Sequence, residues 1–297
     1  MKPSQFGYHQ AASVDDAVSL LEAYEGSARI LAGGQSLVPM LNMRLVRPDA
    51  LVDINRLRRL STVEVAGDDT ILGALVRYST IETAVEIAER LPLLRSVVTH
   101  IGDRQVRNRG TIGGSLCQGD ATGEIPLACL VLDAIVSVTG PAGTRSIPLS
   151  TLYLGSYTTV LEPCEVLTSV RFAKSPGHHA FAEMCRRHND FAVISVACAG
   201  SRTTSGTWND VRIGLGGVAE TPVRATAAET ALSGTMLDEA DLEQAGLLCL
   251  EAIDPPDDIR ATAEYRRHLV PIYVRRVLRA LRAATEGGAG IEGKDLA

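Results

Sequence analysis

Two glycine pairs constrain this chain more than any other feature of its sequence. Each pair follows an apolar residue and precedes a serine, in Ala32-Gly33-Gly34-Gln35-Ser36 and in Thr111-Ile112-Gly113-Gly114-Ser115. Glycine tolerates positive φ and leaves room beside the backbone, so a pair is expected where the chain turns sharply or approaches another group. Successive backbone N–H groups can form an anion-binding concavity, and serine hydroxyls add neutral donors. The two segments are therefore predicted to be loops that hold two linked phosphates.

The residues around the pairs narrow the class of nucleotide. Neither pair belongs to a G-x-x-x-x-G-K-[ST] or a G-x-G-x-x-G motif, and no lysine stands beside either pair. This favours a permanently held pyrophosphate over a nucleoside triphosphate whose phosphoryl group is transferred. Glu124 stands where a helix is predicted to begin and is able to accept a hydrogen bond from a ribose hydroxyl. Both features also have an ordinary interpretation, as turns and as an acidic residue favoured by the helix dipole.

Charge, hydropathy and cysteine spacing exclude several classes of protein. The 29 basic and 35 acidic residues give a net charge of −6, which argues against a nucleic-acid partner. No apolar run approaches the roughly 18 residues of a membrane span, and the first residues lack the apolar region of a secretory signal, so a cytoplasmic location is expected. The six cysteines form no C-x-x-C pair and the histidines show no ligand spacing. No metal site is predicted in this chain.

The pattern of apolar residues divides the chain into regions. Its length predicts two or three domains. In the first part we expect helices after Ser13, from a Ser79/Glu82 capping box and over 125–133, and strands at 29–32, 51–54, 62–66, 70–75 and 135–139. After "KSPGHH", strands at 179–184, 191–199 and 211–215 precede helical segments at 223–232, 238–252 and 261–284. This order indicates an α+β domain with helices on one face of an antiparallel sheet, and Pro271 is expected to kink or break the last helix.

Two long segments resemble a known family. "ILAGGQSLVPMLNMRLVRPDALVDINRL" and "HIGDRQVRNRGTIGGSLCQGDATGEIPLACLVLDA" are similar to the FAD-binding medium subunit of molybdenum hydroxylases, which includes the carbon monoxide dehydrogenase medium subunit and the xanthine dehydrogenase flavin domain. "RRHNDFAVISVA" and "GLGGVAETPVRA" follow in their expected places. The resemblance implies an α+β fold: a PCMH-type FAD-binding domain at 1–175, with two α+β subdomains at about 1–55 and 56–175, a C-terminal α+β domain at 176–287 with an antiparallel sheet and helices, and a tail at 288–297.

The resemblance also implies site residues. Residues Ala32 to Ser36 and Thr111 to Ser115 match the segments that hold the FAD pyrophosphate in the family, Ile101 matches a position against the isoalloxazine, and Glu124 matches an acidic position near the adenosine. Gln35 and Ser115 replace the His and Asn of many relatives and keep hydrogen-bonding ability. Some relatives carry a lysine that reaches the flavin near Arg186-Arg187, where this chain reads Phe181-Ala182-Glu183-Met184. No residue is therefore assigned to tuning the flavin N1 or N5.

The family implies a division of labour between subunits. A large molybdopterin subunit hydroxylates the substrate, a small subunit with [2Fe-2S] clusters relays electrons, and this chain passes them from its FAD to a terminal acceptor, within a dimer of heterotrimers. No catalytic residue of this chain acts on the organic substrate, whose identity stays open, as does that of the acceptor. Two alternatives remain: a self-sufficient flavin oxidase of the vanillyl-alcohol oxidase type, and a noncatalytic nucleotide-binding or assembly protein.

Overall fold

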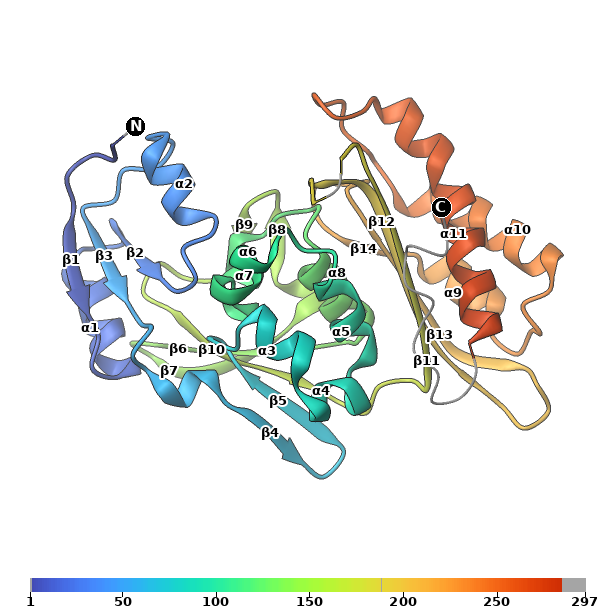
Figure 1. Ribbon diagram of the computed structural model, residues 1–297, viewed down its shortest axis with the longest axis horizontal. Coiled ribbons are helices and arrows are strands. Elements are labelled where there is room, and N and C mark those ends of the chain that lie inside the picture. Colours follow the sequence, from blue (N-terminus) through green and yellow to red (C-terminus); the bar gives the residue numbers. More distant parts are fainter. Residues whose placement is uncertain (1, 188, 285–297) are drawn as a thin grey trace.

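The computed structural model describes residues 2–187 and 189–284. Its N-terminal part is a small parallel sheet covered by one helix (Figure 1). Its strands β1 (Gly7–Gln10), β3 (Ala50–Asp53) and β2 (Ala28–Leu31) lie in that order. Helix α1 (Val14–Ala23) begins as predicted, because the Ser13 hydroxyl accepts a hydrogen bond from the Asp16 N–H. Helix α2 (Leu37–Asn42) directly follows the first glycine pair.

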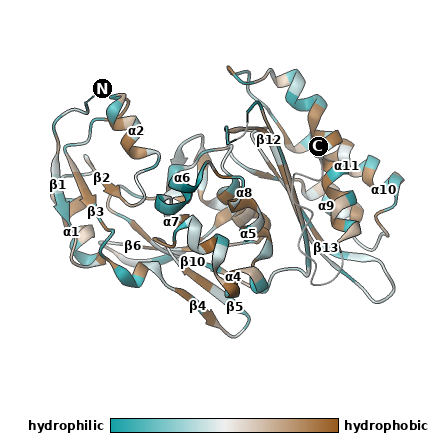
Figure 2. Ribbon diagram, viewed as in Figure 1, coloured by the Kyte–Doolittle hydropathy of each residue, from teal (hydrophilic) through white to brown (hydrophobic). Residues whose placement is uncertain are grey.

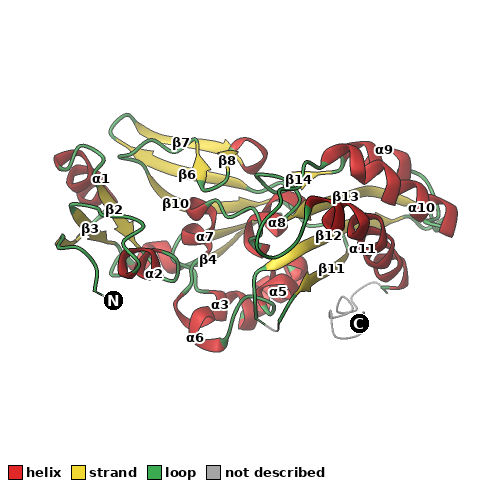
Figure 3. Cartoon of the chain, turned by 90° about the horizontal axis from the view of Figure 1, so that it is seen from above, coloured by secondary structure: helices red, strands yellow, loops and turns green. Residues whose placement is uncertain are grey.

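The middle part is an antiparallel sheet covered by short helices. The strand order is β4 (Val63–Ala66), β5 (Asp69–Gly73), β10 (Val166–Phe172), β6 (Ile135–Gly140) and β7 (Gly143–Pro148), so the predicted hairpin is confirmed. The helices are α3 (Tyr78–Thr83), α4 (Val85–Arg90), α5 (Pro92–Val98), α6 (Arg104–Arg109), α7 (Ile112–Gln118) and α8 (Glu124–Val131); short turns at η1 (Arg58–Ser61) and η2 (Leu149–Thr151) and a hairpin of β8 (Tyr153–Gly155) and β9 (Thr158–Thr159) complete it. In the view from above, α3 and α6 lie on the opposite side of the molecule from β6 and β7 (Figure 3).

The predicted capping box at Ser79 is wrong. Helix α3 begins at Tyr78, with Arg77 in an extended conformation at its N-cap, two residues before the predicted cap. Two contacts fix that start: Arg77 pairs with Thr111 in an isolated β-bridge, and the Tyr78 N–H donates to the Gly110 carbonyl. Tertiary pairing with the second glycine segment therefore overrides the local capping signal.

The C-terminal part is the predicted antiparallel sheet with helices. Strands β11 (His178–Cys185), β12 (Ala192–Arg202), β13 (Trp208–Gly216) and β14 (Val223–Arg224) precede α9 (Thr226–Leu232), α10 (Glu239–Leu248), the turn η3 (Cys249–Ala252) and α11 (Ala263–Ala283). The helix expected from 223 begins at Thr226, because β14 pairs with β13. Helix α11 continues through Pro271, so of the two expected outcomes the break is wrong and the kink stays a prediction; buried neighbours such as Val270 and Val274 hold the helix against the sheet. Residues 285–287 and the predicted tail lie outside the described part of the chain.

This sheet is covered on both faces. Phe181, Ala197 and Ala199 pack with apolar residues of α5 and α8, whereas Ala180, Ala182, Val196 and Cys198 pack with α9, α10 and α11. Residues 192–200 are accordingly buried at every position, the pattern of a strand with no solvent face. Helix α8, which is buried from Ile125 to Val131 and apolar throughout, lies between the two sheets (Figure 2). The predicted helices cover one face, and α5 and α8 of the middle part cover the other.

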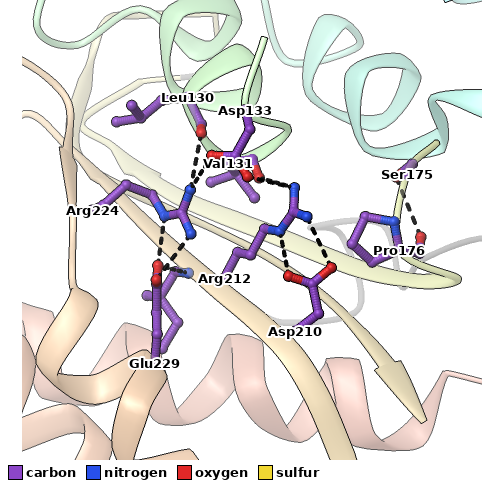
Figure 4. A network of polar contacts seen from close by, with 10 residues as sticks. Leu130, Val131, Asp133, Ser175, Pro176, Asp210, Arg212, Arg224 and Glu229 are labelled. Carbon is purple, nitrogen blue, oxygen red and sulfur yellow. Dashed lines mark hydrogen bonds and ion pairs between the residues drawn. The ribbon is translucent and has the colours of Figure 1, made fainter. Parts of the chain in front are cut away.

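Arginines of the C-terminal sheet fasten it to the end of α8 (Figure 4). Arg224 donates to the Leu130 carbonyl and to Asp133 at 2.8 Å, and it also pairs with Glu229 on α9. Arg212 donates to the Val131 carbonyl at 3.3 Å and pairs with Asp133 at 2.9 Å. The guanidinium groups thus bind carbonyls at the C-terminus of α8, where positive charge interacts favourably with the helix dipole. They fix the C-terminal sheet relative to α8.

The buried His179 makes stability depend on pH. His179 is the second residue of β11, and burial, with His178 beside it, lowers the pKa of His179 to about 4. The folded protein therefore keeps His179 neutral, while the unfolded chain takes up this proton near the ordinary histidine pKa of about 6.5. We expect stability to fall by up to about 3 kcal/mol as the pH drops through this interval.

Urea unfolding of the wild type and of His179→Gln at pH values across that range measures this effect. The variant should lose less stability on acidification than the wild type, while His268→Gln, at an exposed histidine, should follow the wild type. Parallel curves for the wild type and His179→Gln would rule out this histidine as the source.

Candidate cofactor site

The structure packs the first glycine segment against the residues just before the second one. A Cβ atom added to Gly33 would lie 2.4 Å from the Arg109 carbonyl oxygen and 3.0 Å from the Gly110 Cα, so only glycine fits there. Gly110 in turn lies against the ring of Tyr78, where a Cβ would come within 2.4 Å of the ring. The loop after β2 therefore packs on the residues that immediately precede Thr111. The sequence predicts that a bound ligand joins the two segments. In the structure the backbone of the first segment also packs against the backbone just before the second.

A polar network behind the first segment holds this arrangement. Asn55 donates to the Ala32 carbonyl at 2.9 Å and to Asp53 at 2.7 Å, and Asp53 also accepts from the Tyr8 hydroxyl at 2.5 Å. Arg77 donates to Asn55 Oδ1 at 2.5 Å and to the Arg109 carbonyl. One guanidinium thus connects the end of the parallel sheet to the turn before α7.

The first glycine segment keeps its donors free. Gly34 has φ +72°, in the left-handed region that favours glycine, and helix α2 begins at Leu37 after it. Within residues 2–187 and 189–284, the backbone N–H groups of Gly33, Gly34, Gln35 and Ser36 have no hydrogen-bond partner. Consecutive free N–H groups around a left-handed residue form the concavity that binds anions. This segment fits a diphosphate, as its sequence predicts.

The second glycine segment is the first turn of a helix, so its assignment as a loop is wrong. Thr111 is the N-cap of α7, and its hydroxyl accepts from the Gly114 N–H at 3.1 Å. The remaining N–H groups of this turn are also paired inside the protein: Ile112 with Val76, Gly113 with Ala74, and Ser115 with Thr111. A Cβ on Gly113 would come within 2.7 Å of Ala74, so this glycine serves helix packing. The segment offers a helix N-terminus and the Ser115 side chain as its polar groups.

Ser115 and Glu124 lie close to a buried tyrosine. Burial raises the pKa of Tyr78, and a hydrogen bond with Ser115 opposes that rise. Glu124, the first residue of α8, is half-buried nearby, and burial followed by the charge of Glu183 raises the pKa of Glu124. Ile101 is half-buried against the core of the middle part, and its neighbour His100 lies 3.5 Å from Glu183 on β11. Glu124 and Ile101 therefore both lie near Glu183, at the boundary with the C-terminal sheet.

A buried arginine of α11 binds backbone carbonyls of the C-terminal domain at this boundary. Arg266 on α11, 1% exposed, donates to the Val193 carbonyl at 2.8 Å and to the Gly217 carbonyl at 2.5 Å, and its Nη2 lies 2.6 Å from Asp258 Oδ1. The Gly217 N–H donates to the Ala121 carbonyl at 2.9 Å, in the turn just before Glu124. The "GLGG" segment at 214–217 thus holds the turn before α8 through the Gly217 N–H.

Sequence reasoning missed several residues of the site. Asn55, Arg77, Tyr78, Glu183 and Arg266 carry its contacts, and no sequence motif marks any of them. Their roles depend on distant partners, such as the Arg109 carbonyl or the Gly217 turn, that only the fold brings within reach. In the described residues no group of three His, Cys, Asp or Glu side chains is able to hold a metal ion, and no helix is long and apolar enough to cross a bilayer.

Comparisons with known proteins agree with this geometry. The family profile described as "FAD binding domain in molybdopterin dehydrogenase" matches residues 4–174, and that described as "CO dehydrogenase flavoprotein C-terminal domain" matches residues 179–281. The 6-hydroxypseudooxynicotine dehydrogenase complex subunit alpha of Paenarthrobacter nicotinovorans is 37% identical over 94% of this chain and 95% of its own length. The carbon monoxide dehydrogenase medium chain of Afipia carboxidovorans is 35% identical over 95% and 99%.

A solved structure shares the whole architecture. The carbon monoxide dehydrogenase chain from Hydrogenophaga pseudoflava superposes with a TM-score of 0.92 at 35% identity, over 96% of this chain and 100% of that one. The similarity therefore spans both parts of the fold and the boundary between them. The chain belongs to the family of FAD-binding medium subunits of molybdenum hydroxylases, and it is the FAD subunit of a molybdopterin-dependent oxidoreductase.

Proposed function

We propose that this chain binds one FAD across its two glycine segments and passes electrons from the [2Fe-2S] clusters of a small partner subunit to a terminal acceptor. The observation that carries the proposal is the row of free N–H groups at Gly33 to Ser36, held by Arg77 against the turn before α7. FAD supplies the ability to accept electrons singly and to release them as a pair. The chain's own residues bind and orient the cofactor.

Each predicted position has a role in this proposal. The backbone from Ala32 to Ser36 donates to the diphosphate, and α7, from the Thr111 cap to Ser115, presents its N-terminus to the same group. Ile101 covers the isoalloxazine. Glu124, which the family pattern places near the adenosine, lies beside Glu183 and within the same boundary as Ile101, and this placement favours a role near the isoalloxazine.

The partners follow from the family. Relatives are named as subunits of a dehydrogenase complex and as medium chains of carbon monoxide dehydrogenase. By analogy, a large molybdopterin subunit hydroxylates the substrate, and the complex is a dimer of heterotrimers. The six cysteines are free thiols, which agrees with the reducing cytoplasm as its location. We also propose 1–175 and 176–287 as its two domains; β10 ends at Phe172 and β11 begins at His178.

Reconstitution of the purified full chain tests this function. After incubation with FAD and gel filtration, the chain should retain about one flavin per molecule, and FMN, which lacks the diphosphate bridge, should bind far more weakly. The reconstituted chain alone should oxidise no organic substrate, because that chemistry belongs to the partner. A chain that retained no flavin, bound FMN equally well, or oxidised an alcohol unaided would contradict the proposal; the last result would support a self-sufficient oxidase.

A further inference from the structure

One carboxylate oxygen of Glu183 is buried at the boundary between the two domains and has no hydrogen-bond partner among the described residues. Glu183 has a side chain only 9% exposed; its Oε1 lies 3.5 Å from His100 Nδ1 and accepts from the Cys185 thiol at 3.4 Å. Its Oε2 is buried and, among the described residues, meets no hydrogen-bond donor. A buried polar atom without a partner costs roughly 1–3 kcal/mol or more when it is charged. Such an atom indicates a ligand or a proton that the free chain lacks.

A second carboxyl group, that of Glu124, lies within range of the Glu183 charge. Glu124 lies close enough for the charge of Glu183 to act on it, and burial, then Glu183, then Asp120 raise the pKa of Glu124 above its ordinary value. Burial and a nearby like charge both disfavour the ionised form of a carboxyl group, so they favour the protonated form of Glu124. The other titratable groups around the pair are Tyr78, His100, Asp120, Cys185 and Asp190.

The pair lies between two positions assigned to the cofactor. His100, which contacts Glu183, precedes Ile101. The charge of Glu124 acts on Tyr78, whose ring lies against Gly110, just before the Thr111 cap of α7. A flavin held by the α7 N-terminus and Ile101 would therefore bind in the neighbourhood of both carboxyl groups. This step rests on the proposed function.

We propose that Glu124 and Glu183 form a redox-linked proton site, which takes up a proton when the bound FAD is reduced and releases it on reoxidation. Two electrons from a reduced iron–sulfur partner, with one proton, leave one additional negative charge at the cofactor. That charge disfavours the ionised pair, which then takes one proton from water. Reoxidation returns two electrons to the acceptor and both protons to solvent, so charge and mass balance over the cycle.

The midpoint potential of the bound flavin, measured by anaerobic dithionite titration from about pH 6 to about pH 10, tests the linkage. Each proton taken up with two electrons lowers the potential by about 30 mV per pH unit. The wild type should show this additional slope over a range above neutral pH, where the oxidised pair has lost its proton. Glu183→Gln should move the range down by about one pH unit or more, since the like charge is gone. Glu124→Gln should abolish it, and Glu64→Gln, at an exposed site on β4, should leave it unchanged.

Proton uptake by the wild type provides a test that needs no variant. Reduction in weakly buffered solution with an indicator dye should consume between one and two protons, with a maximum in the same pH range. A proton count that does not vary with pH, or identical slopes in the wild type and both Gln variants, would overturn the inference while flavin retention left the proposed function standing. A chain that retained no flavin would overturn both.

Discussion

Gly33→Ala should weaken FAD binding roughly tenfold to a hundredfold, because overpacking of this kind costs about 1–3 kcal/mol. The new methyl group would lie 2.4 Å from the Arg109 carbonyl oxygen, a rigid backbone atom. The segment from Ala32 to Ser36 must therefore move away from the turn before α7, and its free N–H groups move with it. Equilibrium dialysis of the wild type and the variant against FAD measures the change.

Two other glycines provide matched controls. Gly73→Ala meets the Leu60 carbonyl at 2.3 Å, an equally close contact outside the site, so it should lower stability without a specific loss of FAD affinity. Gly177→Ala has open space around the new methyl group and should change neither property. If Gly33→Ala folded and bound FAD as tightly as the wild type, the contact between the segments would have no part in binding.

Arg266→Ala should lower the free energy of unfolding by about 2–6 kcal/mol, because each of two buried carbonyls left without its donor costs about 1–3 kcal/mol. The substitution leaves the Val193 and Gly217 carbonyls without their donor and leaves Asp258 with only the longer contact to Arg260 at 3.8 Å. Urea unfolding gives the free energy. FAD affinity should also fall, since Gly217 holds the turn at Ala121 before α8.

Its neighbour on the same helix is the control for this prediction. Arg267 is exposed, and its 3.9 Å contact with the fully exposed Asp254 is a surface pair. Arg267→Ala should therefore cost less than about 1 kcal/mol. Equal losses in the two variants would show that Arg266 has no special role in joining the sheet to the site.

Local patterns were sufficient to predict most elements. The Ser13 cap, the hairpin of β4 and β5, and the C-terminal strands followed by helices depend on signals within a few residues, and the structure confirms them. The long matching segments identified the family because they preserve a spaced set of residues over nearly the whole chain. The sequence predicts that the glycine at position 33 makes room for a ligand, and the structure shows that it makes room for the Arg109 carbonyl, a contact that no local pattern indicates.

Errors arose where distant contacts decide the local structure. Thr111 to Ser115 forms a helical turn because Val76 and Ala74 accept its N–H groups, and Ser79 is no cap because Gly110 fixes Tyr78. Pro271 is tolerated within a helix that the core holds on both sides of it. Glu183 was noted only as a departure from the family's lysine, since its burial beside His100 requires a strand from one domain and a helix end from the other.

A crystal structure of the full chain with FAD bound tests the central claim most directly. The account predicts the diphosphate within hydrogen-bond distance of the N–H groups of Gly33 to Ser36, with the N-terminus of α7 on its other side. A diphosphate bound elsewhere on the chain, with those N–H groups left to solvent, would contradict it.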